Sequence, residues 1–206
     1  MLKIWGRTTS INVQKVLWCC AELDLKYDRV DAGGKFGVND TPEYLAMNPN
    51  GLVPTISDDG FILWESHAIV RYLSRRHGKG TLWPNDDKVC ADADRWMEWY
   101  STTLWGNLRP VFWNLVRVEP GKRDMKLVED SRRKMADNLR IVENHLAHRP
   151  YMAGGAFTMG DIPMGVALHR WFLLPIERPA YSRLAAYYER LKQRPGFAQH
   201  CAAPLS

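Results

Sequence analysis

A run of 26 residues, from Asn48 to Leu73, constrains the fold of this chain more than any other segment. In order, the run contains a turn at NG, a short apolar strand LVPTI, a hairpin turn at DDG, a second strand FIL and a helix that begins at ES. Gly, Asn and Asp favour turns, and the proline places the first strand at an edge or a strand end. The helix carries its apolar residues at helical spacing.

The residues before this run predict a βαβ unit. Leu2–Trp5 and Tyr27–Val30 fit short strands, and the apolar residues from Ile11 onward follow the spacing of a helix between them. Short links of this kind give parallel strands with a right-handed crossover. With a short helix at Thr41–Met47, the first part of the chain is predicted to be a four-stranded mixed sheet with helices on both faces, ending near His77.

After Pro84 the pattern becomes helical. We expect helices at Asp86 to about Val116, Arg123–Ala147, Asp161 to about Phe172 and Tyr181–Lys192. The predicted domains are therefore an α/β domain at residues 1–78, a linker at 79–86 and an all-helical bundle at 87–206. Thr158 and Asp161 fit a capping box, in which the hydroxyl accepts from the amide of Asp161 and the carboxylate accepts from the amide of Thr158.

Composition excludes several classes of function. The formal net charge is +5, and the excess falls in the second domain, where it either attracts a small anion or is a solvated surface. We find no groove-reading motif and no cluster of basic residues, so nucleic-acid binding is not expected. No segment is long and apolar enough for a membrane span, and a cytoplasmic location is expected. The four cysteines have no metal or redox spacing and are predicted to be buried free thiols.

The order of motifs resembles the glutathione-binding, thioredoxin-like domain of the cytosolic glutathione transferases. The matching pieces are Asn48-Pro49-Asn50-Gly51, Val53-Pro54, the hairpin turn and Glu65-Ser66 leading into Ile69-x-x-Tyr72-Leu73. Trp5-Gly6-Arg7 is similar to bacterial, theta-like or beta-like members. The resemblance implies a thioredoxin-like domain followed by a helical domain. It also implies glutathione as co-substrate without a metal, a small electrophile as second substrate, a homodimer and a role in detoxification.

The resemblance assigns two parts of glutathione to this run. A cis bond at Val53-Pro54 would expose a strand edge that pairs with the cysteinyl residue, whereas a trans bond would leave Pro54 as a simple strand terminator. The start of the helix at Glu65-Ser66 would hold the α-amino acid end, because helix N-termini favour anions and a carboxylate takes the ammonium. Ordinary helix capping is the alternative for this pair.

The glycyl carboxylate of glutathione needs a cation or amide donors. Lys35 and Asn50 are the candidates, with Asn48 behind them. A lone lysine in a glycine-rich loop is also what a solvated surface looks like, and both interpretations of Lys35 stay open.

Catalysis requires glutathione as a thiolate. Ser10 stands at the start of the first helix in a segment that resembles the Ser-Pro-x-Val motif of serine-type transferases, with Ile11 in place of the proline. We predict that Ser10 donates to the thiolate with help from Thr9 or Asn12, and the choice among these and Thr8 stays open. Residues 1–11 contain neither tyrosine nor cysteine, which argues against the tyrosine-type and thiol-exchanging branches.

The electrophile is expected between the domains. Trp105, Arg109, Phe112 and Trp113 would form an apolar pocket with one cation, although tryptophans at helical spacing also fit a core. Arg109 or Arg117 would polarise an acidic substrate or help the thiolate, and the sequence leaves both roles open. The leading function is a glutathione transferase that attacks small electrophiles. The alternatives are a glutathione-dependent dehalogenase or isomerase, and a non-catalytic module that binds glutathione or a protein.

Overall fold

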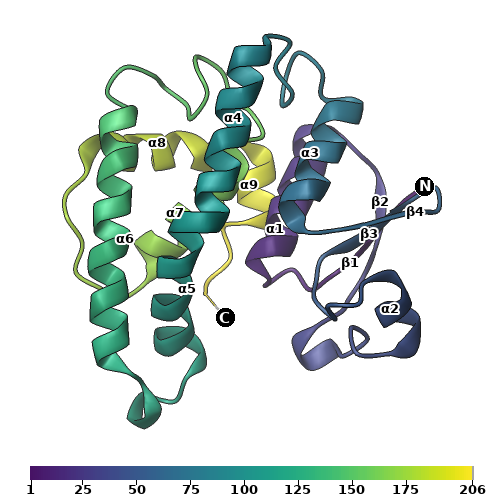
Figure 1. Ribbon diagram of the computed structural model, residues 1–206, viewed down its shortest axis with the longest axis horizontal. Coiled ribbons are helices and arrows are strands. Elements are labelled where there is room, and N and C mark those ends of the chain that lie inside the picture. The colour runs from purple at the N-terminus through teal and green to yellow at the C-terminus, as the bar shows by residue number, and fades with distance from the viewer. Residues whose placement is uncertain (206) are drawn as a thin grey trace.

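A computed structural model describes residues 1–205 of the chain. The first domain is a four-stranded sheet with helices on both faces, as expected (Figure 1). In sheet order the strands are β2 (Tyr27–Val30), β1 (Leu2–Trp5), β3 (Thr55–Asp58) and β4 (Phe61–Trp64). Strands β1 and β2 are parallel, whereas β3 is antiparallel to both β1 and β4. The βαβ unit predicted from the sequence is confirmed.

Helices α1 (Ile11–Glu22) and α3 (Ser66–His77) pack side by side on one face of the sheet, and α2 (Pro42–Met47) lies on the other side (Figure 1). A 3₁₀ turn, η1, occupies Gly34–Phe36. Helix α1 is central to the molecule, because it also packs against α7 and α9 of the second domain. The loop before α1 therefore lies where the two domains meet.

The second domain is helical. Its helices are α4 (Asp87–Trp99), α5 (Trp105–Phe112), α6 (Met125–His145), α7 (Asp161–Leu173), α8 (Ser182–Lys192) and α9 (Pro195–His200). A π-helical segment, η2 (Tyr100–Leu104), joins α4 to α5, and a second, η3 (Trp113–Arg117), continues α5, so that the four segments form one continuous helix. A 3₁₀ turn, η4, occupies Pro120–Lys122. The single long helix expected from the sequence is therefore present, with Pro110 inside α5.

One local prediction is wrong and another is only half correct. The strand expected at residues 52–56 begins only at Thr55, because the carbonyl of Leu52 accepts hydrogen bonds from the side chains of Tyr44 (2.6 Å) and Asn48 (2.8 Å). The capping box is half correct. The carboxylate of Asp161 accepts from the amide of Thr158 at 2.8 Å, but the Thr158 hydroxyl donates to that carboxylate and does not cap the helix.

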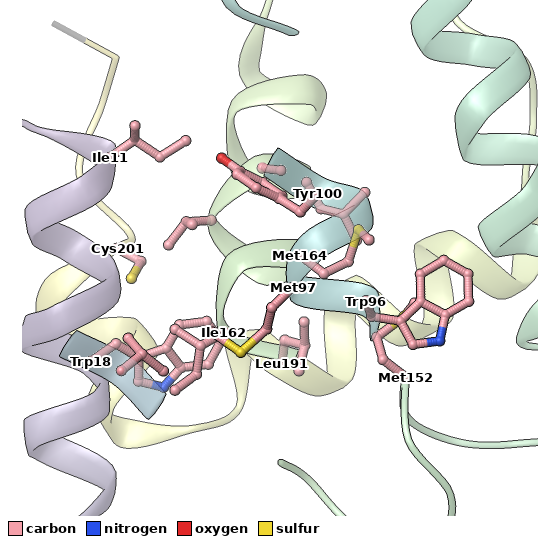
Figure 2. Packing of buried hydrophobic residues seen from close by; sticks show 14 of the residues in the cluster. Ile11, Trp18, Trp96, Met97, Tyr100, Met152, Ile162, Met164, Leu191 and Cys201 are labelled. Carbon is pink, nitrogen blue, oxygen red and sulfur yellow. The ribbon is translucent and has the colours of Figure 1, made fainter. Parts of the chain in front are cut away.

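One hydrophobic core runs through both domains. Figure 2 shows Trp18 of α1 among side chains of the helical domain such as Ile162 and Leu191. Cys19, Cys20 and Cys201 are buried free thiols, as predicted, whereas Cys90 is half-buried. Burial raises the pKa of each buried thiol and keeps it inert.

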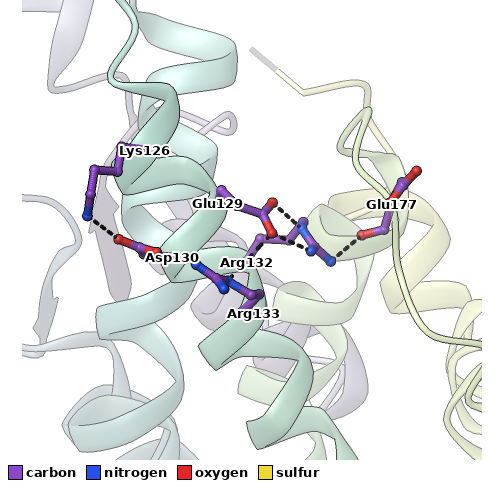
Figure 3. A network of polar contacts seen from close by, with 6 residues as sticks. All are labelled: Lys126, Glu129, Asp130, Arg132, Arg133 and Glu177. Atoms are coloured by element: carbon purple, nitrogen blue, oxygen red, sulfur yellow. Dashed lines mark hydrogen bonds and ion pairs between the residues drawn. The ribbon is translucent and has the colours of Figure 1, made fainter.

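The outer face of α6 is covered by charges. Asp130 pairs with Lys126 and Arg133, while Arg132 pairs with Glu129 and donates to the carbonyl of Glu177 (Figure 3). Such exposed pairs stabilise a fold only slightly. In the part of the chain that the structure describes, no helix has the length and apolar character needed to cross a membrane.

Candidate active site

Ser10 lies at the start of α1, on the wall of a cavity of about 370 Å³ between the two domains. Its backbone is extended, as at an N-cap, but its hydroxyl makes no capping hydrogen bond within residues 1–205. The first amides of an α-helix have no partner inside the helix. The Ser10 hydroxyl and the first turn of α1 are therefore free to act together on a group in the cavity. Thr9 also lines this cavity.

Asn12 lines the 370 Å³ cavity and two smaller neighbouring cavities, of about 170 and 40 Å³. Its Oδ1 accepts a hydrogen bond from Nζ of Lys15 at 3.0 Å. Because the oxygen is held in this way, the amide nitrogen of Asn12 is left as a hydrogen-bond donor. The structure therefore places Asn12 beside Ser10, with a defined orientation.

Lys15 itself was not anticipated as a site residue. Its ammonium is buried between Asn12, the Nε2 atom of His67 at 3.0 Å and the ring of Tyr100, whose centre lies 4.2 Å away. Burial holds the pKa of Lys15 well below its ordinary value. His67 in turn meets the hydroxyl of Ser101 in the helical domain at 3.0 Å, so this cluster joins the two domains behind Asn12.

The Val53-Pro54 bond is cis, as the resemblance implied. Within residues 1–205, neither the N–H nor the carbonyl of Val53 forms a hydrogen bond. Val53 lines both the 370 Å³ and the 40 Å³ cavities. This backbone can therefore pair with an extended peptide that lies in the cavity.

Glu65 and Ser66 line the two smaller cavities together with Asn12, which also lines the 370 Å³ cavity beside Ser10. Glu65 has a φ of 70°, a left-handed conformation that is uncommon for a residue with a side chain and clusters at functional sites. Neither side chain caps α3, and Glu65 forms no ion pair within the described chain. The start of α3 thus offers free amides, a hydroxyl and a carboxylate.

The two residues expected at the glycyl end of the ligand differ in position. Asn50 lines the 40 Å³ cavity, where its side chain donates to Asn48 at 3.1 Å. Lys35 is exposed on η1 with its Nζ atom 5.2 Å from the ring centre of Phe36, and it is not among the residues that line the three cavities. Its role stays a prediction.

The helical domain supplies the opposite wall of the 370 Å³ cavity. All four residues expected there line it, namely Trp105, Arg109, Phe112 and Trp113. Three further arginines join them, and of these Arg7 and Arg170 escaped the sequence analysis while Arg117 was named only as an alternative. No Asp or Glu is among the residues that line this cavity.

Arg170 is the most buried of these arginines. Its side chain comes from α7, donates to the carbonyl of Thr9 at 3.3 Å and covers the ring of Phe112 at 3.9 Å from the ring centre. Burial lowers its pKa to about 10, and repulsion by Arg117 and Arg7 contributes. The cation therefore lies in an environment that already holds positive charge and has no carboxylate to balance it.

Among residues 1–205, no group of three or more His, Cys, Asp and Glu side chains is arranged to hold a metal ion. The cavities bring together a hydroxyl at a helix start, an unpaired strand edge and a second helix start with an acidic residue.

Comparison with known proteins gives the same family over the whole chain. Residues 1–75 match the family model "Glutathione S-transferase, N-terminal domain", and residues 125–190 match "Glutathione S-transferase, C-terminal domain". The chain is 36% identical to glutathione S-transferase GstB of Escherichia coli, with both proteins covered completely, and 30% identical to glutathione S-transferase 3 of Zea mays, with 98% of this chain and 94% of that protein covered.

The solved structures agree. The theta class glutathione S-transferase of Xanthomonas axonopodis pv. citri with glutathione bound is 42% identical, covers 100% of this chain and 99% of its own, and superposes with a TM-score of 0.96. The apo form of that protein gives a TM-score of 0.87 with 36% identity, 100% of this chain and 98% of its own being covered. The order of elements, the site and these similarities lead to one conclusion: the chain belongs to the glutathione S-transferase family.

Proposed function

We propose that this protein is a glutathione transferase in which Ser10 activates the thiol of glutathione for attack on a small electrophile held against α5. The observation that carries the proposal is Ser10, which lies at a helix start, lines the cavity between the domains and has a hydroxyl that is not used for capping. The solved relative with bound glutathione supports glutathione as the ligand.

Glutathione would lie across the three cavities. Its α-amino acid end fits the start of α3 at Glu65 and Ser66, and its cysteinyl backbone pairs with Val53. Its glycyl end then points toward Asn50 and Lys35. This arrangement brings the sulfur toward Ser10 and Asn12, because both residues line the 370 Å³ cavity together with Val53.

Attack on the electrophile requires the thiolate of glutathione, so the site must lower the pKa of the glutathione thiol. A free thiol has a pKa of about 8.5 and is mostly protonated at neutral pH. Lowering that pKa by about 2 units takes roughly 2.7 kcal/mol of preference for the anion, which a hydroxyl donor and a helix N-terminus can supply together. The proton goes to solvent, the sulfur forms a bond to carbon, and the leaving group departs with its electron pair.

Dehalogenation of a halogenated acid is the second candidate. The same thiolate would displace halide, and the arginines around the cavity favour an acidic substrate. Both reactions use the same glutathione site and differ only in the electrophile.

We further propose that the protein is a homodimer, that it is located in the cytoplasm and that it acts in detoxification. Phe61 and Trp64 are 51% and 37% exposed on β4, an edge strand of the sheet, and such apolar surface suits a protein contact. The buried free thiols fit a reducing compartment.

The test of the mechanism is Ser10→Ala. We expect the pKa of bound glutathione, followed by thiolate absorbance, to return toward about 8.5, and kcat with a chlorodinitroarene to fall by about 10²-fold, as when one donor to a catalytic anion is removed. Thr8→Ala is the matched control, because Thr8 is exposed and does not line the cavity. An unchanged thiol pKa in Ser10→Ala would remove Ser10 from this role and turn attention to Asn12.

A further inference from the structure

The cavity that would take the electrophile is lined by four arginines, Arg7, Arg109, Arg117 and Arg170. None of the four forms an ion pair with any carboxylate in residues 1–205, whereas arginines elsewhere in the chain do, as Arg71, Arg132 and Arg194 illustrate. Like charges gathered around an apolar space repel one another unless an anion joins them.

We propose that the electrophilic substrate carries a carboxylate, and that Arg109, Arg117 and Arg170 of the helical domain bind it. The inference rests on the proposed function and names the substrate class for that same site. The three guanidinium groups would then bind the carboxylate at one end of the substrate, while the sulfur of glutathione attacks the reactive carbon at the other end.

Arg170 gives the strongest support. Its side chain is only 5% exposed, yet its bonding partners account for only part of its donors: one nitrogen donates to the carbonyl of Thr9, and its face covers Phe112. A guanidinium has five N–H donors in a fixed fork that matches the two oxygens of a carboxylate. Arg170 lines the cavity, where its remaining donors can serve a ligand.

Arg109 and Arg117 are exposed and lie on the faces of aromatic rings, Arg109 at 5.8 Å from the ring centre of Trp113 and Arg117 at 5.9 Å from that of Phe112. Trp105 adds a third ring to the same wall. An aromatic frame with a carboxylate at one end and a reactive carbon at the other matches this combination of rings and cations in a cavity of about 370 Å³.

Glutathione has carboxylates of its own, and the geometry separates the two ligands. The proposed glutathione contacts at Val53, Glu65 and Ser66 belong to the sheet domain, whereas Arg109, Arg117 and Arg170 come from α5, η3 and α7. Arg7 lies on the sheet domain, beside Gly33. It is left out of the test because it can serve either ligand.

The experiment compares two electrophiles of one shape, 4-chloro-3,5-dinitrobenzoate and 4-chloro-3,5-dinitrobenzamide. In both, the sulfur of glutathione bonds to the ring carbon, chloride leaves with the electron pair, and the thiol proton goes to solvent. Each kcat/KM is divided by the uncatalysed rate constant with glutathione. We expect the natural protein to favour the benzoate by about tenfold or more, in line with one or two charge-assisted hydrogen bonds.

The double variant Arg109→Gln/Arg117→Gln should reduce this preference by about tenfold, while Arg140→Gln, an exposed arginine of α6 outside the cavity, should leave it unchanged. The salt dependence of the preference can be measured on the natural protein, so the result does not depend on whether a variant folds. Salt should weaken the preference for the benzoate, because ions screen partly exposed charges, and should leave turnover of the amide nearly constant.

Two results would overturn the inference: equal corrected turnover of the benzoate and the amide, or a preference that survives in the double variant. Neither would touch the proposed function, since both still require catalysed turnover that depends on Ser10. Failure to bind glutathione, or no turnover of either electrophile above the uncatalysed rate, would instead remove the proposed function itself.

Discussion

His67 is held as a neutral ring between the ammonium of Lys15 and the hydroxyl of Ser101. Burial, with Lys15 and Arg71 nearby, lowers the pKa of His67 from its ordinary value to about 2. In the unfolded chain the ring takes up a proton near pH 6.5. Below that pH the unfolded state binds the additional proton, so this residue makes the folded state less stable as the pH falls.

The prediction concerns His67→Gln, which removes the titrating group. The natural protein should lose more of its free energy of unfolding than this variant between pH 7.5 and pH 5. One such histidine contributes about 2 kcal/mol to that loss. Urea unfolding at the two pH values measures it. His77→Gln, at an exposed histidine, should lose as much as the natural protein. Equal losses for His67→Gln and the natural protein would contradict the account.

Single residues were predictable where a local motif carries them. Ser10, Asn12, Glu65 and Ser66 sit at helix starts that the sequence reveals, and all four line the cavities. Lys15 was not found, because a lysine on a helix is usually solvated. The feature of the sequence that could have revealed the burial of Lys15 is its position four residues after Ile11, which puts both residues on the buried face of α1.

At the scale of elements, α7 begins around a buried carboxylate. Asp161 accepts from the amides of Met152 and Thr158, both at 2.8 Å, and from the hydroxyl of Tyr187 at 2.6 Å. Burial raises its pKa, and these hydrogen bonds oppose the rise. One side chain therefore fixes the start of α7, the loop before it and helix α8.

Asp161→Asn should lower the free energy of unfolding by about 3 kcal/mol, because an amide nitrogen would then face a buried donor and leave it unsatisfied. Asp137→Asn, on the exposed face of α6, should change it by less than about 0.5 kcal/mol. Chemical denaturation gives both values. A loss in Asp161→Asn as small as that in Asp137→Asn would show that the network is not a source of stability.

Helices and strands whose apolar residues recur with a clear helical or strand period were placed within a few residues by the sequence alone. Strands β1 and β2 and helices α7 and α8 begin and end close to the expected positions. Helix α9 was missed because six residues, Pro195–His200, are too few to show a helical period. The start of β3 was misplaced because Tyr44 and Asn48 bind the carbonyl of Leu52, an interaction that no strand pattern encodes.

For the molecule as a whole, Trp18 joins the two domains. The ring is fully buried, with Phe157 and Phe197 against it, and Glu22 accepts from its N–H at 2.8 Å. Gly165 of α7 lies so close that a Cβ there would be 2.7 Å from the Trp18 ring. The close approach of α7 to α1 therefore depends on glycine at position 165, because any side chain there would clash with the Trp18 ring.

Gly165→Ala should destabilise the protein by about 1–3 kcal/mol, because the added methyl group overpacks the contact with Trp18. This cost outweighs the higher helix propensity of alanine compared with glycine. Gly106→Ala in α5 is the matched control, because a Cβ there meets nothing within 4 Å, and it should be neutral or stabilising by up to about 1 kcal/mol. Because the core is shared, both domains should unfold in one transition. Thermal unfolding checks this, and two separate transitions in Gly165→Ala would contradict a common core.

The division into a sheet domain and a helical domain followed from the change in pattern along the sequence. The cluster of arginines did not, because its members are spread from residue 7 to residue 170 and only the packing of α1, α5 and α7 brings them together. Composition did indicate that the excess of positive charge belongs to the second domain, which contributes three of the four.

The bond from Arg170 to the carbonyl of Thr9 has a consequence for how such proteins diversify. It spans 161 positions of sequence and ties the loop that carries Ser10 to the centre of the other domain. In the proposed function, the position of Ser10 beside the glutathione thiol therefore depends on residues from both ends of the chain. Under that proposal, replacing one domain by a foreign one would break this bond, so the substrate contacts of Arg170 and the thiol contacts of Ser10 could not be altered independently.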